Sequence, residues 1–426
     1  MDRPRTAPGH DAVIVGAGLA GSAAAILLAR AGWRVALAER KRFPRRKVCG
    51  ECLAASNLPL LHALGVGRAF EASAGAELRR VALLAGGARV EAPLPPAPSA
   101  HHRWGRALGR DALDALLIDA ARAAGAEVLQ PAAVRRIEGG PGLWRCTVRD
   151  AAGEAELRAP VLIDAHGSWE ALPSERARDG RGRRGADLLA FKAVFEGAAH
   201  APDTIGVLAL DGGYGGIVTA GDGLATVAGC VRRDRLETLR AAAPGARAGD
   251  VFERWLRRCP GVEAALAGAR RDGPWLASGP LRPGIRTGIA DGLLRVGNAG
   301  AEAHPILGEG MSMALQSAAL LATRLLDPAY GLGPAAGATA PADARDVAAR
   351  LVALQRDHHR AFRREFAPRL GLAAAFAHVA MRPAASGALA GLARACPALL
   401  THGARRGGKV RLAVDLPALA RAGASS

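Results

Sequence analysis

A strand, a glycine loop, a helix and a second strand near the N-terminus constrain the fold more than any other feature of the sequence. Residues 12–15 form an apolar run typical of a buried parallel strand, and residues 16–21 follow with the spacing G-x-G-x-x-G. Residues 22–31 predict a helix, and residues 34–38 predict a second strand that ends on Glu39. This order predicts the βαβ unit with which doubly wound α/β folds bind dinucleotides.

Each glycine of this unit has a separate physical task. Gly16 allows the tight turn out of the strand, Gly18 lets a pyrophosphate approach the backbone, and Gly21 lets helix and strand pack closely. The helix N-terminus presents free N–H groups to the phosphates, and Glu39 lies where a carboxylate accepts hydrogen bonds from ribose hydroxyls. The expected dinucleotide contacts in this unit are Gly16, Ala17, Gly18, Ala20, Gly21, Glu39 and Arg40.

The formal net charge of +18 raises the question of nucleic-acid binding. Nearly all of this charge is arginine, because lysine occurs only at positions 41, 47, 192 and 409. Such arginine usage is typical of a GC-rich genome, and the densest run, residues 176–184, is interpreted as a solvated loop. We therefore expect no nucleic-acid partner, although the excess charge favours contact with anionic membranes or acidic carriers.

The cysteines and the apolar segments favour a soluble, cytoplasmic protein. Six cysteines in 426 residues are too sparse for a disulfide scaffold. The N-terminal segment is too polar for a signal peptide, and no uninterrupted stretch of about 20 apolar residues is found. Peripheral membrane contact stays open as an alternative, and the sequence does not determine the oligomeric state.

Cys49 and Cys52 form a C-x-x-C pair in a basic loop after the second strand. A zinc site would need two further ligands at finger-like spacing, and the sequence has no such pair, so we expect no metal. A thioredoxin-type dithiol would need a βαβ setting of its own. The preferred interpretation is a turn beside the dinucleotide, and a redox-active disulfide is the alternative.

A second glycine-rich loop follows another predicted strand. The strand ends at Val296, the loop begins with Gly297-Asn298-Ala299, and a helix is expected from about Gly310 to Leu326. The N-terminus of that helix would stabilise negative charge on a ligand. His304 in this loop is a candidate proton donor or ligand contact, and the alternative is a purely structural loop residue.

Hydrophobic patterns elsewhere predict an α/β fold with an inserted, antiparallel β-sheet domain and C-terminal helices. Alternating residues predict several strands between 187 and 233, and two C-terminal helices are expected at about 343–367 and 371–400. The expected parts are a nucleotide-binding domain at 10–170 that includes a β segment at 78–108, a mainly β substrate-binding domain at 171–284, the last part of the nucleotide-binding domain at 285–330, and a linker with helices at 331–426.

Four motifs resemble the flavoprotein superfamily of p-hydroxybenzoate hydroxylase-type monooxygenases and geranylgeranyl reductases. They are the G-x-G-x-x-G unit with Glu39-Arg40, the segment Lys47-x-Cys49-Gly50-Glu51, the helix start Arg110-x-x-Leu113-Asp114-x-x-Leu117, and Gly297-Asn298-Ala299 with Pro305-x-x-Gly308-x-Gly310-Met311. Together they cover roughly residues 10 to 330. The resemblance implies a Rossmann-like FAD-binding domain of the glutathione-reductase type.

The resemblance also implies FAD as the cofactor and extends the expected contacts. Outside the first unit, these contacts are Lys47, Cys49, Gly50, Arg110, Val134, Gly297, Asn298, Pro305, Gly308, Gly310 and Met311. His304 and Cys49 are the catalytic candidates. Because only one dinucleotide fold is predicted, NADPH or NADH is expected to bind transiently as the electron donor, and a protein donor is the alternative.

The sequence departs from the family pattern at three points. Asn298 stands where the usual acidic residue of a G-D motif is found, and Asp164 does not align clearly with the D-G motif linked to NAD(P)H contact. The aromatic halogenase motif Trp-x-Trp-x-Ile-Pro is absent, so we do not expect halogenation.

Three functional hypotheses follow from these motifs. The first is a FAD-dependent monooxygenase that acts on an apolar or aromatic small molecule. The second is a FAD-dependent reductase of prenyl or other lipid double bonds, which the Cys49-Gly50 segment and the apolar C-terminal region favour. The third is a non-catalytic carrier of a prenylated ligand, although such a carrier would not need the glycines of both flavin loops.

Overall fold

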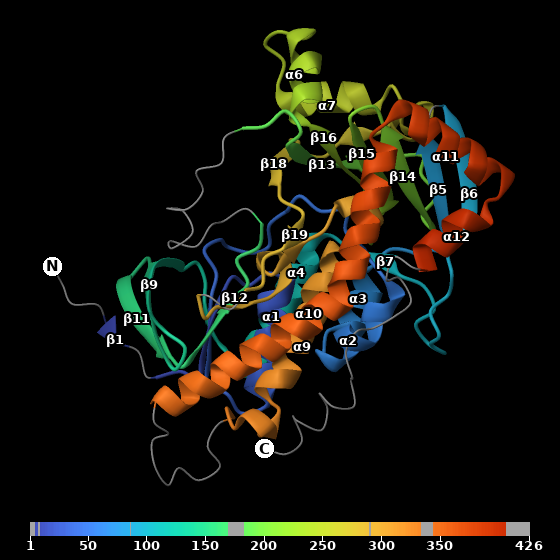
Figure 1. Ribbon diagram of the computed structural model, residues 1–426. Coiled ribbons are helices and arrows are strands. Elements are labelled where there is room, and N and C mark those ends of the chain that lie inside the picture. Colours follow the sequence, from blue (N-terminus) through green and yellow to red (C-terminus); the bar gives the residue numbers. More distant parts are fainter. Residues whose placement is uncertain are drawn as a thin grey trace.

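The computed structural model describes residues 5–6, 9–85, 87–168, 183–288, 291–333 and 344–405. Two large sheets organise this part of the chain, and a long C-terminal helix runs beside both (Figure 1). Outside the described residues lie residues 176–182 of the basic run, most of the predicted linker after residue 330, the basic tail after Arg405, and Gly86.

The first sheet is the parallel sheet of the nucleotide-binding domain, and its strand order is β20-β12-β2-β3-β8. Its strands are β20 (Leu294–Arg295), β12 (Val161–Asp164), β2 (Ala12–Val15), β3 (Val35–Ala38) and β8 (Glu127–Leu129). Every residue of the three central strands is buried, as expected for a parallel sheet covered on both faces. The predicted βαβ unit is therefore confirmed at the centre of the sheet.

The two faces of this sheet pack against different layers. Ala12 and Ile14 face α1 (Leu19–Arg30), which in turn contacts α4 (Arg110–Ala123) and α9 (Gly310–Leu325). Val13 and Val15 face a four-stranded sheet on the opposite side. That sheet contains β1 (Arg5–Thr6), β11 (Gly153–Ala159), β10 (Leu143–Asp150) and β9 (Ala133–Gly140). Strands β9, β10 and β11 pair antiparallel, and β1 is added in parallel beside β11.

The second large sheet has eight strands. Along its path they are β17 (Arg270–Arg271), β13 (Leu188–Glu196), β16 (Ala225–Arg232), β15 (Gly213–Thr219), β14 (Thr204–Leu210), β5 (Arg80–Ala85) and β6 (Ala88–Pro93), and β18 (Leu276–Leu281) also pairs with β13. All pairs are antiparallel except β5 with β14. The β segment that the sequence placed with the nucleotide-binding domain at 78–108 thus supplies two strands of this sheet, because β5 pairs with a strand about 120 residues away.

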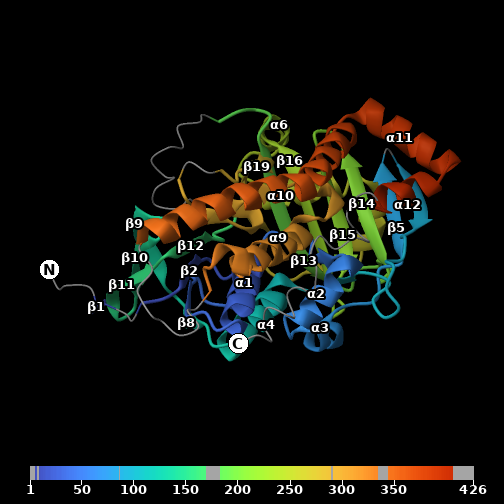
Figure 2. The ribbon, with the colours of Figure 1, turned by 60° about the horizontal axis from the view of Figure 1, so that its bottom comes forward.

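Helices cover both faces of the eight-stranded sheet. One face packs against α6 (Arg233–Ala241), α7 (Ala248–Leu256) and α8 (Pro260–Leu266). The other face contacts the C-terminal helices α10 (Ala344–Ala380) and α11 (Pro383–Ala395), and α12 (Ala398–Ala404) contacts β6 at the edge. Figure 2 shows α10 crossing the molecule from the end of β9 to α11, which lies over β5.

The predicted break in the C-terminal helices between residues 367 and 371 is wrong, because α10 is continuous through Pro368. Buried residues form one stripe at positions 362, 366, 369, 373 and 377, with the spacing of three and four residues that keeps a single helical face against the core. Packing on both sides of the proline thus offsets the cost of the missing hydrogen bond. The helix ends instead before Pro383.

The remaining short elements connect these layers. They are β4 (Cys52–Leu53), η1 (Ala55–Asn57), α2 (Leu58–Ala63), α3 (Gly67–Ser73), β7 (Arg106–Ala107), β19 (Gly284–Ile285), η2 (Gly297–Ala299), β21 (Ala301–Glu302), η3 (Pro305–Leu307) and η4 (Pro328–Tyr330). Strands β19 and β20 are each two residues long, and β20 leads into the second glycine loop through Val296.

Candidate active site

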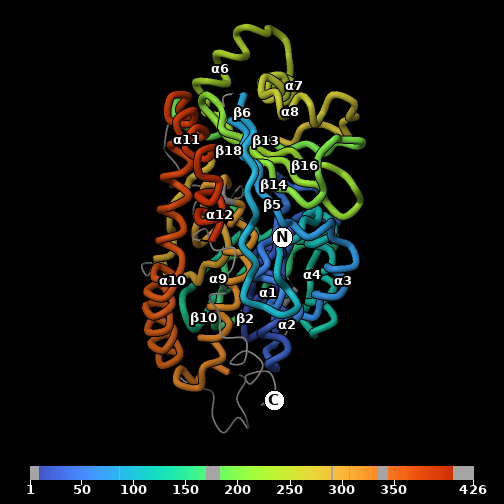
Figure 3. Tube along the Cα trace, turned by 90° about the vertical axis from the view of Figure 1, so that its right-hand side faces the viewer, coloured from blue at the N-terminus to red at the C-terminus, as the bar shows by residue number. Residues whose placement is uncertain are grey.

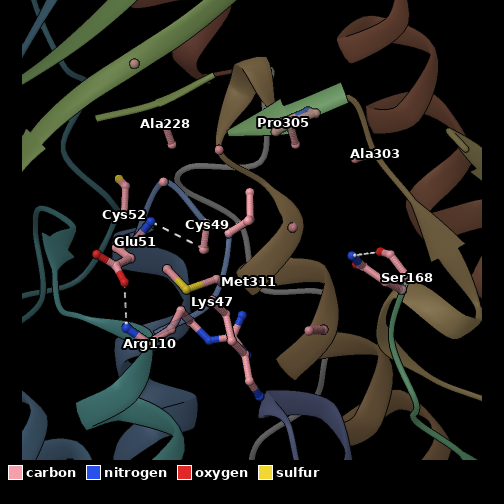
Figure 4. Close-up of a pocket in the computed structure, with 18 of the residues that line it drawn as sticks. Lys47, Cys49, Glu51, Cys52, Arg110, Ser168, Ala228, Ala303, Pro305 and Met311 are labelled. Atoms are coloured by element: carbon pink, nitrogen blue, oxygen red, sulfur yellow. Dashed lines mark hydrogen bonds between the residues drawn. The ribbon is translucent and has the colours of Figure 1, made fainter. Parts of the chain in front are cut away.

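A cavity of ≈ 650 Å³ lies between the parallel sheet and the eight-stranded sheet. It brings together most of the residues that the sequence assigned to a cofactor, namely Gly16, Gly18, Ala20, Glu39, Arg40, Lys47, Cys49, Gly50, Arg110, Val134, Gly297, Asn298, Pro305, Gly308, Gly310 and Met311. Three of the predicted residues do not line it: Ala17, Gly21 and His304. Figure 4 shows part of this cavity, with Lys47 and Cys49 reaching it from the loop after β3, Arg110 from α4 and Met311 from α9.

The glycine loop after β2 leaves free space where a pyrophosphate would lie. Gly16 has φ +99°, which only glycine adopts without strain. A Cβ on Gly21 would lie 1.8 Å from the backbone oxygen of Gly16, so Gly21 serves the packing of α1 rather than the cavity. A Cβ on Gly18 would meet nothing closer than the Arg110 guanidinium at 3.8 Å and the Lys47 ammonium at 4.0 Å. The space above Gly18 is therefore open and faces two cations.

Lys47 and Arg110 share one buried carboxylate, Asp114. The Lys47 Nζ lies 2.6 Å from Asp114 Oδ2, and the Arg110 Nη2 lies 2.9 Å from Asp114 Oδ1. Burial lowers the pKa of Lys47. The nearby carboxylate of Asp114 acts to raise this pKa, but it offsets the effect of burial only in part. Burial also acts to lower the pKa of Arg110, but Asp114 and Cys49 outweigh it and the pKa is raised. Two cations beside one carboxylate leave an excess positive charge at the open space above Gly18.

Glu39 forms the far wall of this end of the cavity. It is buried at the end of β3, and its Oε2 accepts a hydrogen bond from the backbone N–H of Ala17 at 3.0 Å. The backbone N–H of Lys41 donates to Oε1 at 2.8 Å. The carboxylate is thereby held beside Val134, which also lines the cavity. Ala17 is thus placed to orient the acid rather than to contact a ligand.

The second glycine loop closes the opposite side. The Asn298 side chain donates to Ser168 Oγ at 2.7 Å, and both residues line the cavity. Gly308 adopts φ +64°, and a Cβ on Gly310 would meet nothing within 4 Å. The N-terminus of α9 therefore opens onto the cavity, where its dipole stabilises negative charge.

The residue with the most unusual environment in this wall is Glu51. It is 2% exposed and is the one non-glycine residue with a positive φ (57°) in the described part of the chain. Its carboxylate accepts hydrogen bonds from the Arg110 backbone N–H at 2.8 Å, from Thr226 Oγ1 at 2.6 Å and from the Lys192 ammonium. Glu51 thus joins the start of α4 to β13 and β16 and connects the two sheets across the cavity wall.

Sequence reasoning missed Lys192, which is 1% exposed. A signal was present, because this lysine interrupts the apolar strand LLAFKAVF. A charged residue in such a run is almost never fully buried unless it is paired. Cys49 accepts a hydrogen bond from the Glu51 N–H at 3.4 Å, and no disulfide joins Cys49 to Cys52.

His304 lies behind the cavity wall, and Tyr214 takes the position facing the cavity. The Tyr214 hydroxyl and His304 Nδ1 are 3.2 Å apart. Burial raises the pKa of Tyr214 well above its ordinary value. Burial, followed by the charge of the exposed His378, lowers the pKa of His304. Neutral phenol and neutral imidazole are therefore the forms present near pH 7.

The cavity continues from Tyr214 into a region we call the apolar arm. From the eight-stranded sheet and its margin the arm is lined by Val81, Leu83, Leu94, Ile205, Val207 and Val218, and from the C-terminal helices by Leu372, Phe376, Leu389, Ala393, Leu399 and Leu400. Alternate residues of β5 and β14 face the arm, while Leu84 and Leu208 face the core under α7. The arm is therefore a product of strand alternation and of the C-terminal helices together.

Comparisons with known proteins agree with this geometry. Residues 10–196 match the family model described as FAD binding domain. The chain is 26% identical over 359 residues to conditioned medium factor receptor 1 of Dictyostelium discoideum, covering 74% of this chain and 63% of that protein. It is 38% identical over 119 residues to menaquinone reductase of Mycobacterium tuberculosis, covering 28% of each. The chain thus spans less than two thirds of the length of these relatives.

Solved structures share the fold. A geranylgeranyl bacteriochlorophyll reductase-like protein from Thermoplasma acidophilum superposes with a TM-score of 0.67 at 18% identity, covering 99% of this chain and 96% of that chain. FAD-dependent halogenases and PqsL of Pseudomonas aeruginosa, described as a probable FAD-dependent monooxygenase, also have this fold. The family match covers residues 10–196, and the likeness to these solved structures shows that the described chain shares their overall fold.

Proposed function

We propose that this protein uses FAD to reduce a carbon–carbon double bond in an apolar, chain-bearing substrate. The observation that carries the proposal is the apolar arm, which leads from the expected flavin position to the C-terminal helices and is walled by aliphatic side chains on both sides. An apolar chain placed there is removed from water, which stabilises binding by about 25 cal/mol per Å² of buried apolar surface.

The residues of the cavity fit FAD. Glu39 is placed to accept from ribose hydroxyls, the open space above Gly18 faces Lys47 and Arg110, and the N-terminus of α9 faces the opposite side. When bound, FAD supplies hydride transfer. NADPH or NADH is proposed as a transient electron source, since a single parallel sheet with one glycine motif is found among the described residues.

Reduction of a double bond requires one hydride and one proton, and Tyr214 is placed to supply the proton. Its raised pKa keeps the phenol protonated at neutral pH, and its hydroxyl lies within hydrogen-bond distance of His304. His304 can return a proton from Nδ1 to the phenolate while its Nε2 takes up a proton from solvent, and the exposed ring of His378 stands 6.3 Å from the His304 ring. The hydride adds to one carbon of a polarised double bond, and the phenol proton goes to the other carbon.

The test is an anaerobic single turnover with dithionite-reduced, FAD-loaded protein and a polyprenyl quinone. After any quinol has been reoxidised to the quinone in air, the expected product still carries two additional hydrogen atoms in its side chain, as measured by mass spectrometry. A protein that binds FAD and is reduced, but leaves polyprenyl and other apolar alkenes unchanged, would contradict the proposal. The related menaquinone reductase supports the choice of this substrate class.

Oxygenation of an apolar or aromatic compound is the second candidate. It is favoured by the resemblance to hydroxylases and by the PqsL fold, which is described as that of a FAD-dependent monooxygenase. In air, a monooxygenase product gains one oxygen atom, and no product forms without O2. The carrier hypothesis is tested by the same preparation, because a carrier stays colourless after incubation with FAD.

A further inference from the structure

Exposed apolar side chains gather at one end of the C-terminal region. Among the described residues the exposed large hydrophobic side chains are Leu143, Val379, Leu392 and Leu399. Leu143 lies in the four-stranded sheet, and the other three lie at the end of α10 and on α11 and α12. We call α11 and α12 the C-terminal elbow; their axes are bent by 110°. Figure 3 shows the elbow beside β6, at the end of the long helix α10.

The charged side chains in the sequence around the C-terminal elbow are all cationic. No aspartate or glutamate occurs between Glu365 and Asp415 in the sequence. Within the same stretch Arg382, Arg394 and Arg405 are exposed. The elbow therefore combines apolar surface with cationic charge and carries no acidic side chain that would repel an anionic surface.

The elbow also borders the mouth of the apolar arm. Leu399 lines the cavity and is 41% exposed, and Gly403 and Ala404 line it from the same short helix. None of the residues of α12 is buried, and Thr401 Oγ1 donates to the backbone oxygen of Pro93 at 2.6 Å. Helix α12 therefore lies between the cavity and the solvent and forms the rim of the cavity mouth. The hydrogen bond from Thr401 attaches this rim to the end of β6.

We propose that the C-terminal elbow docks on an anionic lipid surface, with Leu392 and Leu399 in the headgroup region and the mouth of the apolar arm facing the lipid. No helix in the described ranges is long and apolar enough to cross a bilayer by itself. An apolar face flanked by arginines is suited to lie in the interface plane, where apolar burial and attraction to anionic lipids act together. The inference that a chain-bearing substrate enters the apolar arm from the lipid rests on the proposed function. The inference that the elbow binds lipid does not.

A second copy of this chain is a poorer occupant. Pairing two elbows would bring Arg382, Arg394 and Arg405 of both copies together without an acidic partner from the same surface, and like charges across an interface are costly. An anionic bilayer supplies negative charge opposite these arginines. It also requires no shape complementarity, so a shallow surface of small residues and two leucines can dock on it.

The experiment is cosedimentation of the full-length protein with vesicles of phosphatidylcholine alone or with 30% phosphatidylglycerol, the latter at low and high salt. Binding to the anionic vesicles that weakens with salt is expected. Leu392→Asp and the double variant Arg382→Glu/Arg394→Glu are each expected to weaken it by about tenfold or more. Leu143→Asp is the matched control, because Leu143 and Leu392 are both 56% exposed and Leu143 lies outside the elbow.

Several outcomes would overturn the proposal. They are no binding at low salt, equal binding to both kinds of vesicle, or equal weakening by Leu143→Asp and Leu392→Asp. Light scattering provides a further check, since a dimer that Leu392→Asp converts to monomer would assign the elbow to a second copy. Flavin content and turnover of a short, water-soluble alkene are measured in parallel, so that loss of the enzyme reaction is distinguished from loss of lipid binding.

Discussion

The two ends of the cavity are built in opposite ways. At the nucleotide end, backbone groups of two glycine loops and a few charged side chains converge, and specific hydrogen bonds hold several of them, such as that from the Ala17 N–H to Glu39. At the apolar arm, aliphatic side chains from strands and helices far apart in the chain line the walls. Ligand binding at the nucleotide end therefore requires exact hydrogen-bond geometry. Ligand binding in the apolar arm depends mainly on the volume and apolarity of the cavity.

The largest effect is expected at the nucleotide end, from Gly21→Ala. Its Cβ would lie 1.8 Å from the Gly16 backbone oxygen, which cannot move away without displacing β2 or α1. We expect loss of folded, flavin-containing protein, measured by circular dichroism and by visible absorbance. Gly18→Ala is the control, because its Cβ meets only the flexible ends of Arg110 at 3.8 Å and Lys47 at 4.0 Å; this variant is expected to fold and to bind FAD less tightly. Equal folding of both variants would refute the geometric argument.

Lys192→Met tests the connection between the two ends. The substitution leaves the Glu51 carboxylate buried without its cation, and such a break costs about 3–5 kcal/mol. The free energy of unfolding is measured by denaturant titration. Adding Glu51→Gln removes the uncompensated charge, so the double variant is expected to recover part of the loss. A single variant as stable as the parent protein would show that the pair contributes little.

Tyr214→Phe distinguishes a role of Tyr214 in proton donation from a role in cofactor binding, at the start of the apolar arm. It removes the proposed proton donor and keeps the ring, so we expect about 100-fold slower turnover with unchanged FAD content. Rapid-mixing kinetics of alkene reduction provide the measurement. Unchanged turnover would remove Tyr214 from the mechanism and leave Cys49 as the donor to test next, through Cys49→Ser.

His358 tests whether acid sensitivity arises outside the cavity. This histidine is fully buried on α10, and burial lowers its pKa to about 3. Because the unfolded chain binds a proton near pH 6.5, stability is present above that pH and is lost as the pH falls towards 3. The expected slope is about 1.4 kcal/mol per pH unit between pH 5.5 and pH 4. In His358→Leu this contribution to the pH dependence of unfolding disappears; an unchanged profile would assign it elsewhere.

The smallest effect is expected inside the apolar arm, from Phe376→Ala. The side chain is part of a wall of similar residues, so its loss removes apolar contact without breaking a hydrogen bond. We expect KM for a long-chain substrate to rise by about tenfold while the flavin spectrum and the FAD affinity stay unchanged. A loss of FAD would show that the two ends are not independent.

The sequence predicted the nucleotide end well because its geometry is local. The spacing of Gly16, Gly18 and Gly21 dictates the turn and the start of the helix whatever the rest of the chain does. The strand and helix boundaries from residue 12 to residue 38 are confirmed to within a few residues, and the helix from Gly310 begins at the expected residue.

Other features depended on contacts between distant residues. The parallel pairing of β5 with β14 took residues 80–85 into the second sheet, and no local pattern names a strand's partner. The continuity of α10 depended on packing that outweighed Pro368. Tyr214 replaced His304 at the cavity surface because strand alternation in β15 decides which side chain faces inward.

The sequence by itself determined that this chain folds around a dinucleotide-binding unit and which glycines shape it, because turn geometry is a property of a few adjacent residues. Only the tertiary structure decided that Lys192 meets Glu51 across 141 positions, and that strands from two parts of the chain meet the C-terminal helices to form the apolar arm. Buried ion pairs and cavity walls arise from long-range packing, in which each residue's partner is fixed by the whole fold.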